Sequence, residues 1–439
     1  MQPLRPQLWF LLPWLVLSIF SHPQIAQASG FALSEQSVKG LGNAFSGGAT
    51  VEDASAIFFN PAALTQLSGN SVQGAAFYLS PTVRFENQGS SLINGTPLRG
   101  GEGGEAGVNA VVPNLYTAWS LSRSIKLGLG VNVPFALTTE YQSDWVGRYQ
   151  AVKSKLTTIN INPAVAAKLN EQLSVGAGVN LQYANAELSN AIDLGLIGSS
   201  FGLRSLPQSA DGFVEVTGDD WSWGYNLGIL YTPSKNTRIG LAYRSAITHQ
   251  LKGNADFSVP TVAAPITQHG LFTDTDAKAE LKLPDNLSLS VYQKVSPQVA
   301  ITGDVTWTNW SRFDELRIEF DNPDQPDKVQ PQNWQDTVRL GLGVNYQVNN
   351  ALTLRAGVAY DLTPVKDEYR TARIPDSDRT WVAVGASWRP SDSLSLDVGY
   401  AHLFLGDAPI EQVSTTEGIL KGEYDNQVDI VGVQLNWSF

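Results

Sequence analysis

The sequence predicts an all-β protein, a closed antiparallel β-barrel that crosses a membrane with its strands. The last twelve residues, 428–439, alternate apolar side chains with polar or small ones and end on Phe439. A tilted strand of this length spans the hydrocarbon core of a bilayer, and an aromatic residue at its end suits the membrane interface. The same two-residue period recurs from about residue 71 onward. This period, the terminal aromatic residue and the arrangement of the connections together predict the barrel.

Fourteen strands are predicted, and an even number is what a closed bacterial barrel requires. Eight of them alternate clearly and six alternate more weakly. The clear strands are 125–133, 173–183, 221–231, 299–307, 338–348, 352–362, 394–400 and 428–439. The weaker strands are 72–85, 115–121, 155–169, 239–247, 277–295 and 381–388.

Short and long connections alternate strictly between these strands. A soluble β-sandwich has no reason to sort its connections in this way, whereas an outer-membrane barrel has short periplasmic turns and long extracellular loops. The short turns lie near 122–124, 170–172, 233–236, 296–298, 349–350 and 390–392. The long loops fall at about 86–110, 135–154, 186–219, 248–276, 310–336, 363–379 and 405–426.

The N-terminus predicts a cleaved secretory signal peptide, residues 1–28. Arg5 precedes a mostly apolar run, 8–20, and the Ala-Gln-Ala at 26–28 fits the small-x-small cleavage pattern. The apolar run is too short for a membrane anchor helix. The mature chain would begin at Ser29, and it contains no apolar run of the length that a helical span needs.

Composition and spacing exclude several kinds of site. The chain has no cysteine, which rules out disulfides and thiolate metal ligands, and its formal net charge of −12 makes nucleic acid a poor partner. The acidic loop 321–327 lacks the EF-hand spacing, and the histidines of the mature chain lack the spacing of zinc ligands. The GxG motifs at 128–130 and 341–343 are explained as lumen-facing glycines, because neither belongs to a βαβ unit. No metal or cofactor is therefore expected.

Residues 29–70 precede the first strand and predict a plug inside the barrel. A barrel of fourteen strands should leave a lumen that its own side chains cannot fill. The segment does not alternate, and the apolar residues 56–59 argue against a disordered leader. Asn60 is a favoured helix N-cap and Pro61 suits the first helical position, so a short helix to about Gln66 is expected.

Two groups of motifs stand out, one in the plug and one after the third strand. The plug motifs are Gly40-Leu41-Gly42-Asn43-Ala44, Gly47-Gly48-Ala49, Asp53-Ala54-Ser55 and Phe59-Asn60-Pro61-Ala62. The later motifs are Pro134-Phe135-Ala136-Leu137, Glu140-Tyr141 and Trp145-Val146-Gly147-Arg148-Tyr149. These motifs resemble those of the FadL/TodX (OmpP1) family, outer-membrane transporters of long-chain fatty acids and aromatic hydrocarbons. The resemblance covers essentially all of the mature chain, with Ala63 and Ala136 at positions where the family often has glycine.

The resemblance implies an N-terminal hatch, 29–70, within a transmembrane barrel, 71–439. It implies that cargo enters an apolar groove among the extracellular loops and moves to a deeper pocket. The hatch then shifts, and the cargo leaves sideways near the third strand. The residues expected to bind substrate are Phe31, Phe135, Leu137, Arg148, Phe201 and Leu203. The residues expected to form the hatch and gate are Gly30, Asn60, Pro61, Ala62, Pro134 and Ala136.

A hydrophobic cargo also makes physical sense of the long loops. Burying a methylene is worth roughly 0.8 kcal/mol, so a sixteen-carbon chain gains about 12 kcal/mol on leaving water, before the costs of binding. Such a molecule needs a relay of apolar sites. Arg148, Arg204 or Lys252 is a candidate partner for a carboxylate, with a solvated surface charge as the alternative for each. The apolar loop candidates, which could instead pack together as a lid, are Leu194, Leu196, Ile197, Phe201, Leu203, Val259, Val262, Ile266, Leu271 and Phe272.

We therefore expect a monomeric, non-enzymatic transporter in the bacterial outer membrane that takes up long-chain fatty acids passively. Aromatic or alkane hydrocarbons are the alternative cargo. Outer-membrane lipid and lipopolysaccharide should surround it, and the barrel-assembly machinery should recognise Phe439. Two other function classes fit the sequence less well. A barrel lipase or esterase is disfavoured because no GxSxG motif accompanies His402, and a diffusion porin is disfavoured by the plug.

Overall fold

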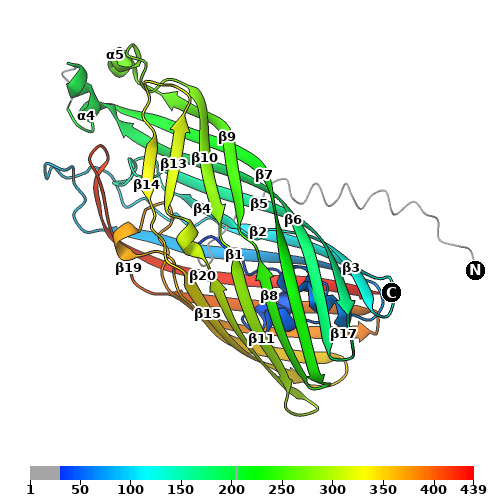
Figure 1. The fold of residues 1–439 in the computed structure, drawn as a ribbon. Coiled ribbons are helices and arrows are strands. Elements are labelled where there is room, and N and C mark those ends of the chain that lie inside the picture. The colour runs from blue at the N-terminus through cyan, green and yellow to red at the C-terminus, as the bar shows by residue number, and fades with distance from the viewer. Residues whose placement is uncertain (1–29, 203–205) are drawn as a thin grey trace, which may run out of the picture.

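The computed structural model describes residues 30–202 and 206–439 (Figure 1). The predicted signal peptide, Leu203 and Arg204 therefore lie outside the described residues. Among the described residues, none of the helices has the length and apolar character needed to cross a membrane.

The strands form one closed antiparallel sheet of fourteen crossings, which confirms the predicted fold. Closure comes from the first and last strands, which pair from Ser71 opposite Ser438 to Asn87 opposite Gly422. Several crossings are broken into two pieces. In order, the crossings are β1 (Ser71–Asn87), β2 (Ala110–Ser120), β3 (Ile125–Asn132) with β4 (Ala136–Glu140), β5 (Lys153–Lys168), β6 (Leu173–Asp193), β7 (Asp211–Ser234), β8 (Thr237–Arg244) with β9 (Ile247–Ser258), β10 (Thr275–Leu283) with β11 (Asn286–Lys294), β12 (Val299–Thr308) with β13 (Glu315–Phe320), β14 (Lys328–Pro331) with β15 (Thr337–Gln347), β16 (Leu352–Asp361), β17 (Arg379–Ser391), β18 (Leu394–Leu405) with β19 (Ala408–Ser414), and β20 (Gly418–Ser438).

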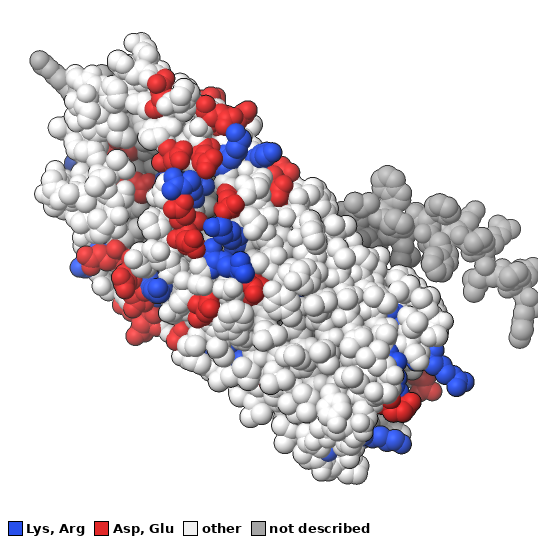
Figure 2. All heavy atoms as spheres, viewed as in Figure 1, with Lys and Arg blue, Asp and Glu red and all other residues white. Residues whose placement is uncertain are grey.

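The outer surface of the barrel carries an apolar belt. On β20, Val431, Val433 and Leu435 are each about half exposed, whereas Gln434 between them is buried on the lumenal side. Figure 2 shows charged side chains gathered toward the two ends of the barrel, with an uncharged zone between them. A band of apolar side chains flanked by charge is the surface that a bilayer core requires.

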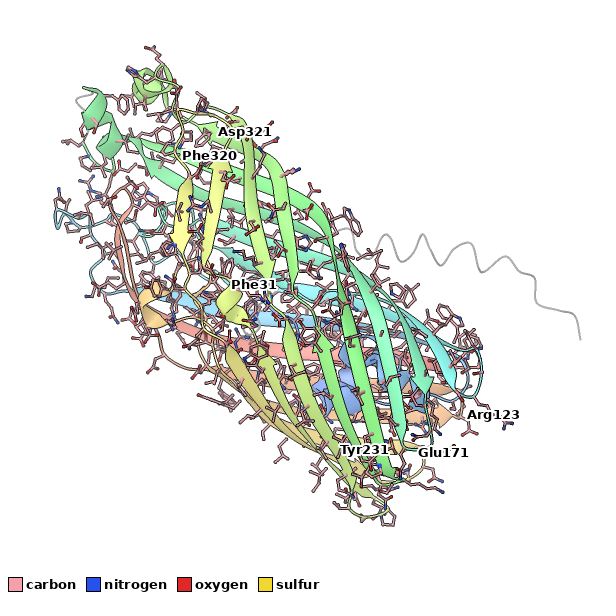
Figure 3. All side chains as sticks on the ribbon, viewed as in Figure 1. Phe31, Arg123, Glu171, Tyr231, Phe320 and Asp321 are labelled. Atoms are coloured by element: carbon pink, nitrogen blue, oxygen red, sulfur yellow. The ribbon has the colours of Figure 1, made fainter. Side chains whose placement is uncertain are left out.

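The connections separate by length to opposite ends of the barrel. Figure 3 shows Arg123 and Glu171, which lie in two of the short turns, at one end of the molecule. Phe320 and Asp321, which begin a long connection, lie toward the other end. The strict alternation of short and long connections in the sequence is thus a segregation by face, as expected of a barrel inserted in one direction.

Several strands run further than the sequence pattern indicated. The predicted long loop 186–219 is wrong in its extent, because β6 continues to Asp193 and β7 begins at Asp211. Beyond the apolar belt the outward side chains no longer face lipid, so hydrophobic alternation ends while backbone pairing continues. The single strand predicted at 277–295 is instead divided into β10 and β11 at Pro284, which has no backbone N–H for the ladder.

Residues 30–70 lie inside the barrel (Figure 1), where they fold into short helices. These are α2 (Val38–Leu41), η2 (Gly48–Thr50), α3 (Ala56–Phe59) and η3 (Pro61–Gln66). The helix expected after Asn60 is present as a 3-10 helix, and the Asn60 side chain caps it by accepting the Ala62 N–H at 3.1 Å.

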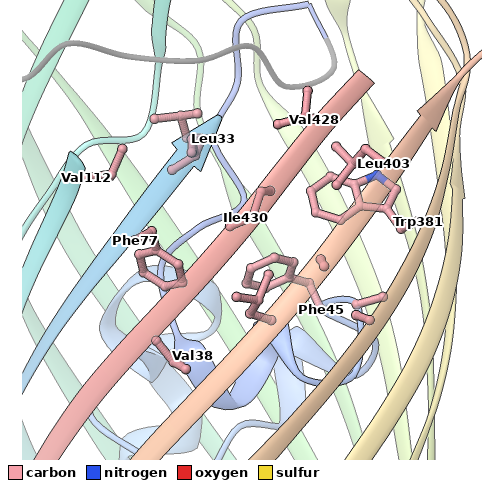
Figure 4. Close-up of a cluster of buried hydrophobic side chains, with 14 of the residues drawn as sticks. Leu33, Val38, Phe45, Phe77, Val112, Trp381, Leu403, Val428 and Ile430 are labelled. Atoms are coloured by element: carbon pink, nitrogen blue, oxygen red, sulfur yellow. The ribbon is translucent and has the colours of Figure 1, made fainter. Parts of the chain in front are cut away.

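The plug shares a hydrophobic core with the wall (Figure 4). Val38 and Phe45 of the plug pack among side chains from several strands, including Phe77, Trp381 and Ile430. Because this core is continuous, the plug is an integral part of the folded barrel.

Glycines on the lumenal face let the plug approach the wall closely. Gly176 on β6 and Gly228 on β7 are register partners, and Asn60, Pro61 and Ala62 lie directly against them. A Cβ atom at either glycine would overlap the plug. The GxG motifs have the same role, since a Cβ at Gly128 on β3 would meet Ile57 and one at Gly343 on β15 would meet Ser46. Together these glycines let the plug pack directly against the lumenal face of the wall.

Candidate functional site

The third barrel strand is interrupted between β3 and β4. The pairing of β3 with β2 ends where Val131 lies opposite Leu115. β4 pairs with β5 along one edge, and its other edge meets the loop before β2 in an isolated bridge between Thr139 and Gly107. At the interruption the Thr158 side chain replaces part of the ladder. The Phe135 N–H donates to Thr158 Oγ1 at 3.0 Å, and that hydroxyl donates to the Phe135 carbonyl at 2.7 Å. The wall therefore has a place where two neighbouring strands are not joined by backbone hydrogen bonds.

The N-terminal segment, residues 30–37, occupies this place. The Leu33 N–H donates to the Pro134 carbonyl at 2.8 Å, and the Ala136 N–H donates to the Phe31 carbonyl at 2.9 Å. Ala32 thus lies opposite Phe135 in an isolated antiparallel bridge. The segment satisfies backbone groups that the missing pairing with β2 would otherwise leave open. The structure therefore brings Pro134, Phe135 and Ala136 together with the start of the plug.

Phe31 is the centre of a buried aromatic cluster in the lumen (Figure 3). Its side chain is 1% exposed and makes edge-to-face contacts with Trp310 at 4.8 Å, Phe313 at 5.6 Å and Phe135 at 6.1 Å between ring centroids. Trp334 completes the cluster. The plug thus presents an aromatic anchor to the wall.

An apolar cavity opens beside Phe31. Leu137 of β4 lines it, as expected, together with residues of the wall from β5 to β13 and of the connection after β16. Charged residues border it only at Lys155, Lys278 and Glu280 among the described residues. The apolar lining includes Leu156, Ala186, Leu188, Val216, Leu251, Ala277, Leu281, Phe313, Leu316, Ile318 and Ile374.

Small residues shape one wall of this cavity. Ala186, Gly218, Gly253 and Ala277 are successive register partners across β6, β7, β9 and β10. Because each of these four strands has only glycine or alanine at the aligned position, the lumenal face is recessed along this row. The recess runs across the strands and is bordered by leucines, which suits an elongated apolar ligand.

A model of the family described as outer membrane protein transport protein (OMPP1/FadL/TodX) matches residues 19–439. This chain belongs to that family. The putative outer membrane protein NMB0088 of Neisseria meningitidis serogroup B is 32% identical, over 94% of this chain and 95% of its own length. The long-chain fatty acid transport protein of Escherichia coli K12 is 29% identical over the same shares. The crystal structure of a Pseudomonas aeruginosa FadL homologue aligns with a TM-score of 0.87 at 26% identity, covering 93% of this chain and 100% of the homologue.

Membership places this FadL-family protein in the outer membrane, as the apolar belt of the barrel also indicates. The family consists of transporters, so the chain is an outer-membrane transporter of this family.

The apolar residues expected in the third and fourth long loops form a separate cluster at the extracellular tips. α4 (Leu194–Gly198) and α5 (Ala264–Thr267) carry its buried centre, Leu194 and Ile266. The partly buried members include Ile197, Phe201, Val259, Leu271 and Phe272, whereas Val262 is 60% exposed and Leu196 packs on a different cluster. Phe201 and Phe31 therefore mark two distinct apolar sites, one at the tips and one in the lumen.

The structure places neither Arg148 nor Lys252 on the lumenal cavity. Arg148 is buried, pairs with Asp211 at 2.8 Å and donates to the Arg99 carbonyl at 2.5 Å, so it holds loops together. Lys252 is exposed. The position of Arg148 therefore does not support its expected role as the partner of a fatty-acid carboxylate.

Reasoning from sequence missed a buried charged group at the centre of the lumen. Glu35 of the N-terminal segment is 1% exposed, and neither of its carboxylate oxygens has a hydrogen-bond partner among the described residues. Burial raises the pKa of Glu35 to about 7, although Arg379 and Arg339 lower it in part. Arg379 Nε and Nη1, and Arg339 Nε, also have no partner there. In the sequence, the one feature that pointed to this buried charged group is Arg339, which takes a lumen-facing position in the predicted strand 338–348.

Arg339 reaches a second cavity of about 130 Å³ beneath the N-terminal segment. The aromatic residues Phe58, Phe59 and Phe135 line this cavity. Its charged lining residues are two arginines, Arg244 and Arg339, and two aspartates, Asp304 and Asp361.

Proposed function

We propose that this FadL-family protein carries long-chain fatty acids passively across the outer membrane. The observation that carries the proposal is the apolar cavity between Phe31 of the plug and Leu281 of the wall, with its recessed row of small residues. An acyl chain in this cavity would be shielded from water on both sides. The related Escherichia coli protein bears the name of a long-chain fatty acid transport protein.

The proposed route has three stages. Cargo first leaves water at the apolar cluster of the loop tips around Leu194 and Ile266, then moves to the cavity beside Phe31. The N-terminal segment then leaves the edge of Pro134–Ala136, which uncovers the interruption in the third strand. A sideways exit there would bring the acyl chain into the membrane without returning it to water. The free energy gained by burying the acyl chain would therefore be kept.

Arg339, which lines the second cavity beneath the N-terminal segment, is the proposed partner of the carboxylate. Its Nε–H has no partner among the described residues and lies in a buried region, where a charge-assisted hydrogen bond is stronger than in water. A saturated hydrocarbon has no acceptor for this N–H. The alternative cargo, an aromatic hydrocarbon, is favoured by a different observation, the mutual contacts of the aromatic rings of Phe31, Phe313 and Trp334.

The test is binding of oleate to the purified protein in detergent, with toluene and hexadecane as competitors. Saturable oleate binding that Arg339→Gln weakens about tenfold or more, with no loss in the exposed-turn control Arg123→Gln, is the expected result. Displacement of weakly bound oleate by either hydrocarbon, with no effect of Arg339→Gln, would assign the protein to hydrocarbon uptake instead.

A further inference from the structure

A mainly polar cavity of about 440 Å³ lies between the plug and the wall at the end of the barrel that carries the short turns (Figure 3). Residues 39–59 of the plug line it on one side, and the ends of β8, β11, β12 and β15 to β18 line it on the other. Exposed turn residues at its rim include Lys235 and Asn350. We call this cavity the periplasmic basin. It shares no lining residue with the apolar cavity beside Phe31.

The charge on the periplasmic basin is opposite in sign to that of the whole chain. Six lysines and arginines line it against two acidic residues, whereas the chain has a formal net charge of −12. Both acidic residues are already paired, because Asp53 lies 3.6 Å from Lys39 and Glu52 pairs with Arg238. Four lining cations remain that have no ion-pair partner among the described residues: Lys235, Lys294, Arg355 and Arg389.

These four cations stand on two flanks of the basin. Lys294 is on β11, and Lys235 is in the turn that leads into β8, the neighbour of β11. Arg355 on β16 and Arg389 on β17 belong to another pair of neighbouring strands. β12 and β15 lie between the flanks, so β11 and β16 are three strand spacings, about 14 Å, apart along the wall.

The surface between the two flanks is polar, and neither β12 nor β15 places a charged residue on it. Thr302 of the wall and Ser46 of the plug meet there, with 2.6 Å between their hydroxyl oxygens. Asn43 of the plug is 6% exposed, and neither its Oδ1 nor that of Asn345 on β15 has a hydrogen-bond partner in the described part of the chain. These two amide oxygens are available to accept hydrogen bonds from hydroxyl groups of a ligand.

Arg238 adds a buried donor to the flank of the two lysines. Its side chain is 8% exposed, and its guanidinium carbon lies 3.8 Å from the centre of the Tyr292 ring. Its Nε–H has no hydrogen-bond partner among the residues described. Because the guanidinium is planar and stacked, this N–H has a fixed direction, as the recognition of a phosphate or carboxylate requires.

The arrangement of charge defines the kind of ligand that fits. A concave site lined by one sign of charge focuses the field and concentrates counter-ions. Two cationic flanks with an uncharged polar surface between them match a hydrophilic molecule that carries an anionic group at each end and hydroxyl groups in the middle. An acyl chain does not fit this description, because it would bury the polar groups of the basin without replacing their hydrogen bonds to water.

We propose that the periplasmic basin binds a small hydrophilic polyanion, a saccharide with at least two phosphate or carboxylate groups, one held by each flank. The site is separate from the apolar cavity, so the proposal does not depend on which cargo the protein transports.

The test is calorimetric titration of the purified, folded protein in a neutral detergent. Fructose 1,6-bisphosphate is the ligand, and fructose 6-phosphate is the matched ligand with one phosphate. The bisphosphate should bind at one site at least tenfold more tightly, because its second phosphate gains charge-assisted hydrogen bonds on the other flank. Arg355→Gln and Lys294→Gln, one from each flank, should each remove most of this preference.

The control is Arg123→Gln, which removes a positive charge at the same end of the barrel but outside the basin, and should keep the full preference. A second measurement confirms that each variant is folded. The bisphosphate should raise the melting temperature of the unmodified protein and of Arg123→Gln, because it binds only the folded state. It should raise that of Arg355→Gln and Lys294→Gln much less.

Three outcomes would overturn the proposal. Equal affinity for the two fructose phosphates at matched ionic strength, or an equal loss in Arg123→Gln, would mean that the basin holds an adventitious ion only. Displacement of the bisphosphate by oleate would assign the basin to the cargo route. Binding of an oligoglutamate peptide without binding of the bisphosphate would assign it to an acidic protein segment. A protein that binds the bisphosphate as expected but neither binds nor transports oleate would support the basin and remove only the proposed cargo.

Discussion

At the scale of single residues, the plug packs closely against the wall at glycines, which have no side chain to hold it off. The side chain of Asn60 caps η3 and donates to the Ala49 and Ile229 carbonyls at 2.8 and 3.0 Å, so it joins two parts of the plug to β7. It does so at a place where the wall offers Gly228 and no side chain. The expected role of Asn60 as a structural residue of the hatch therefore stays a prediction with a clear physical basis.

Gly228→Ala is expected to destabilise the seated plug by about 1–3 kcal/mol, because the added methyl group overlaps the Asn60 side-chain oxygen. The measurement is the melting temperature of the folded barrel, followed by its heat-dependent shift on electrophoresis. Gly74→Ala on β1 is the matched control, because nothing lies within 4 Å of its added Cβ. Equal melting temperatures for the two variants would show that close contact at Gly228 is not needed.

Glu35 is expected to make the stability of the closed protein depend on pH. Its pKa is raised by burial to about 7 in the folded protein, above the ordinary value of 4.5. The folded state therefore binds the proton more tightly than the unfolded state, so stability falls as pH rises from about 4.5 through 7. Glu35→Gln should flatten the difference in melting temperature between pH 5 and pH 8. Glu102→Gln, at an exposed loop position, should keep it, and a difference that survives in Glu35→Gln would assign the effect to other groups.

At the scale of elements, the N-terminal segment is joined to the third strand by an isolated antiparallel bridge. It forms few backbone hydrogen bonds with β4 and its flanking residues, whereas each complete barrel strand is paired along both edges. Separating the segment from the wall should therefore cost less free energy than separating two paired barrel strands.

Sequence periodicity predicted the strands but could not predict this pairing. Alternation reports which side chains face lipid, and it located β3 because Ile125, Leu127 and Leu129 alternate with inward residues. The bridge between Ala32 and Phe135 joins positions about a hundred residues apart and leaves no periodic trace. The same holds for residues 370–377, which are buried, since their sequence shows a long connection without showing that it folds inward.

Locking the segment should stop transport. Ala32 and Phe135 are a non-hydrogen-bonded antiparallel pair, and the Cα separation of such pairs, about 4.5 Å, is within the range that a disulfide spans. Ala32→Cys with Phe135→Cys should transport at background level when oxidised and recover on reduction. The reduced double variant is its own control for the lost aromatic ring. Transport that continues at an equal rate after complete oxidation would show that the segment does not have to leave the third strand.

At the scale of the whole molecule, the fold class and the cargo class follow from how polarity is distributed. The outside carries an apolar belt with charged side chains on both sides of it (Figure 2). The lumen holds a plug that packs against the wall. These features were predictable from period, loop length and the apolar content of residues 29–70. The charged cluster of Glu35, Arg339 and Arg379 was not, because it is assembled from three distant segments.

The central claim is that this barrel takes up long-chain fatty acids, and uptake itself tests it most directly. The measurement is the initial rate of radiolabelled oleate uptake by Gram-negative cells that lack their own long-chain fatty acid transporter and express this chain. Cells with an empty vector give the background, and radiolabelled hexadecane is measured in parallel. Oleate uptake well above the vector, exceeding that of hexadecane, is the predicted result. Oleate uptake at the vector level, with the protein folded in the outer membrane at normal amounts, would contradict the account.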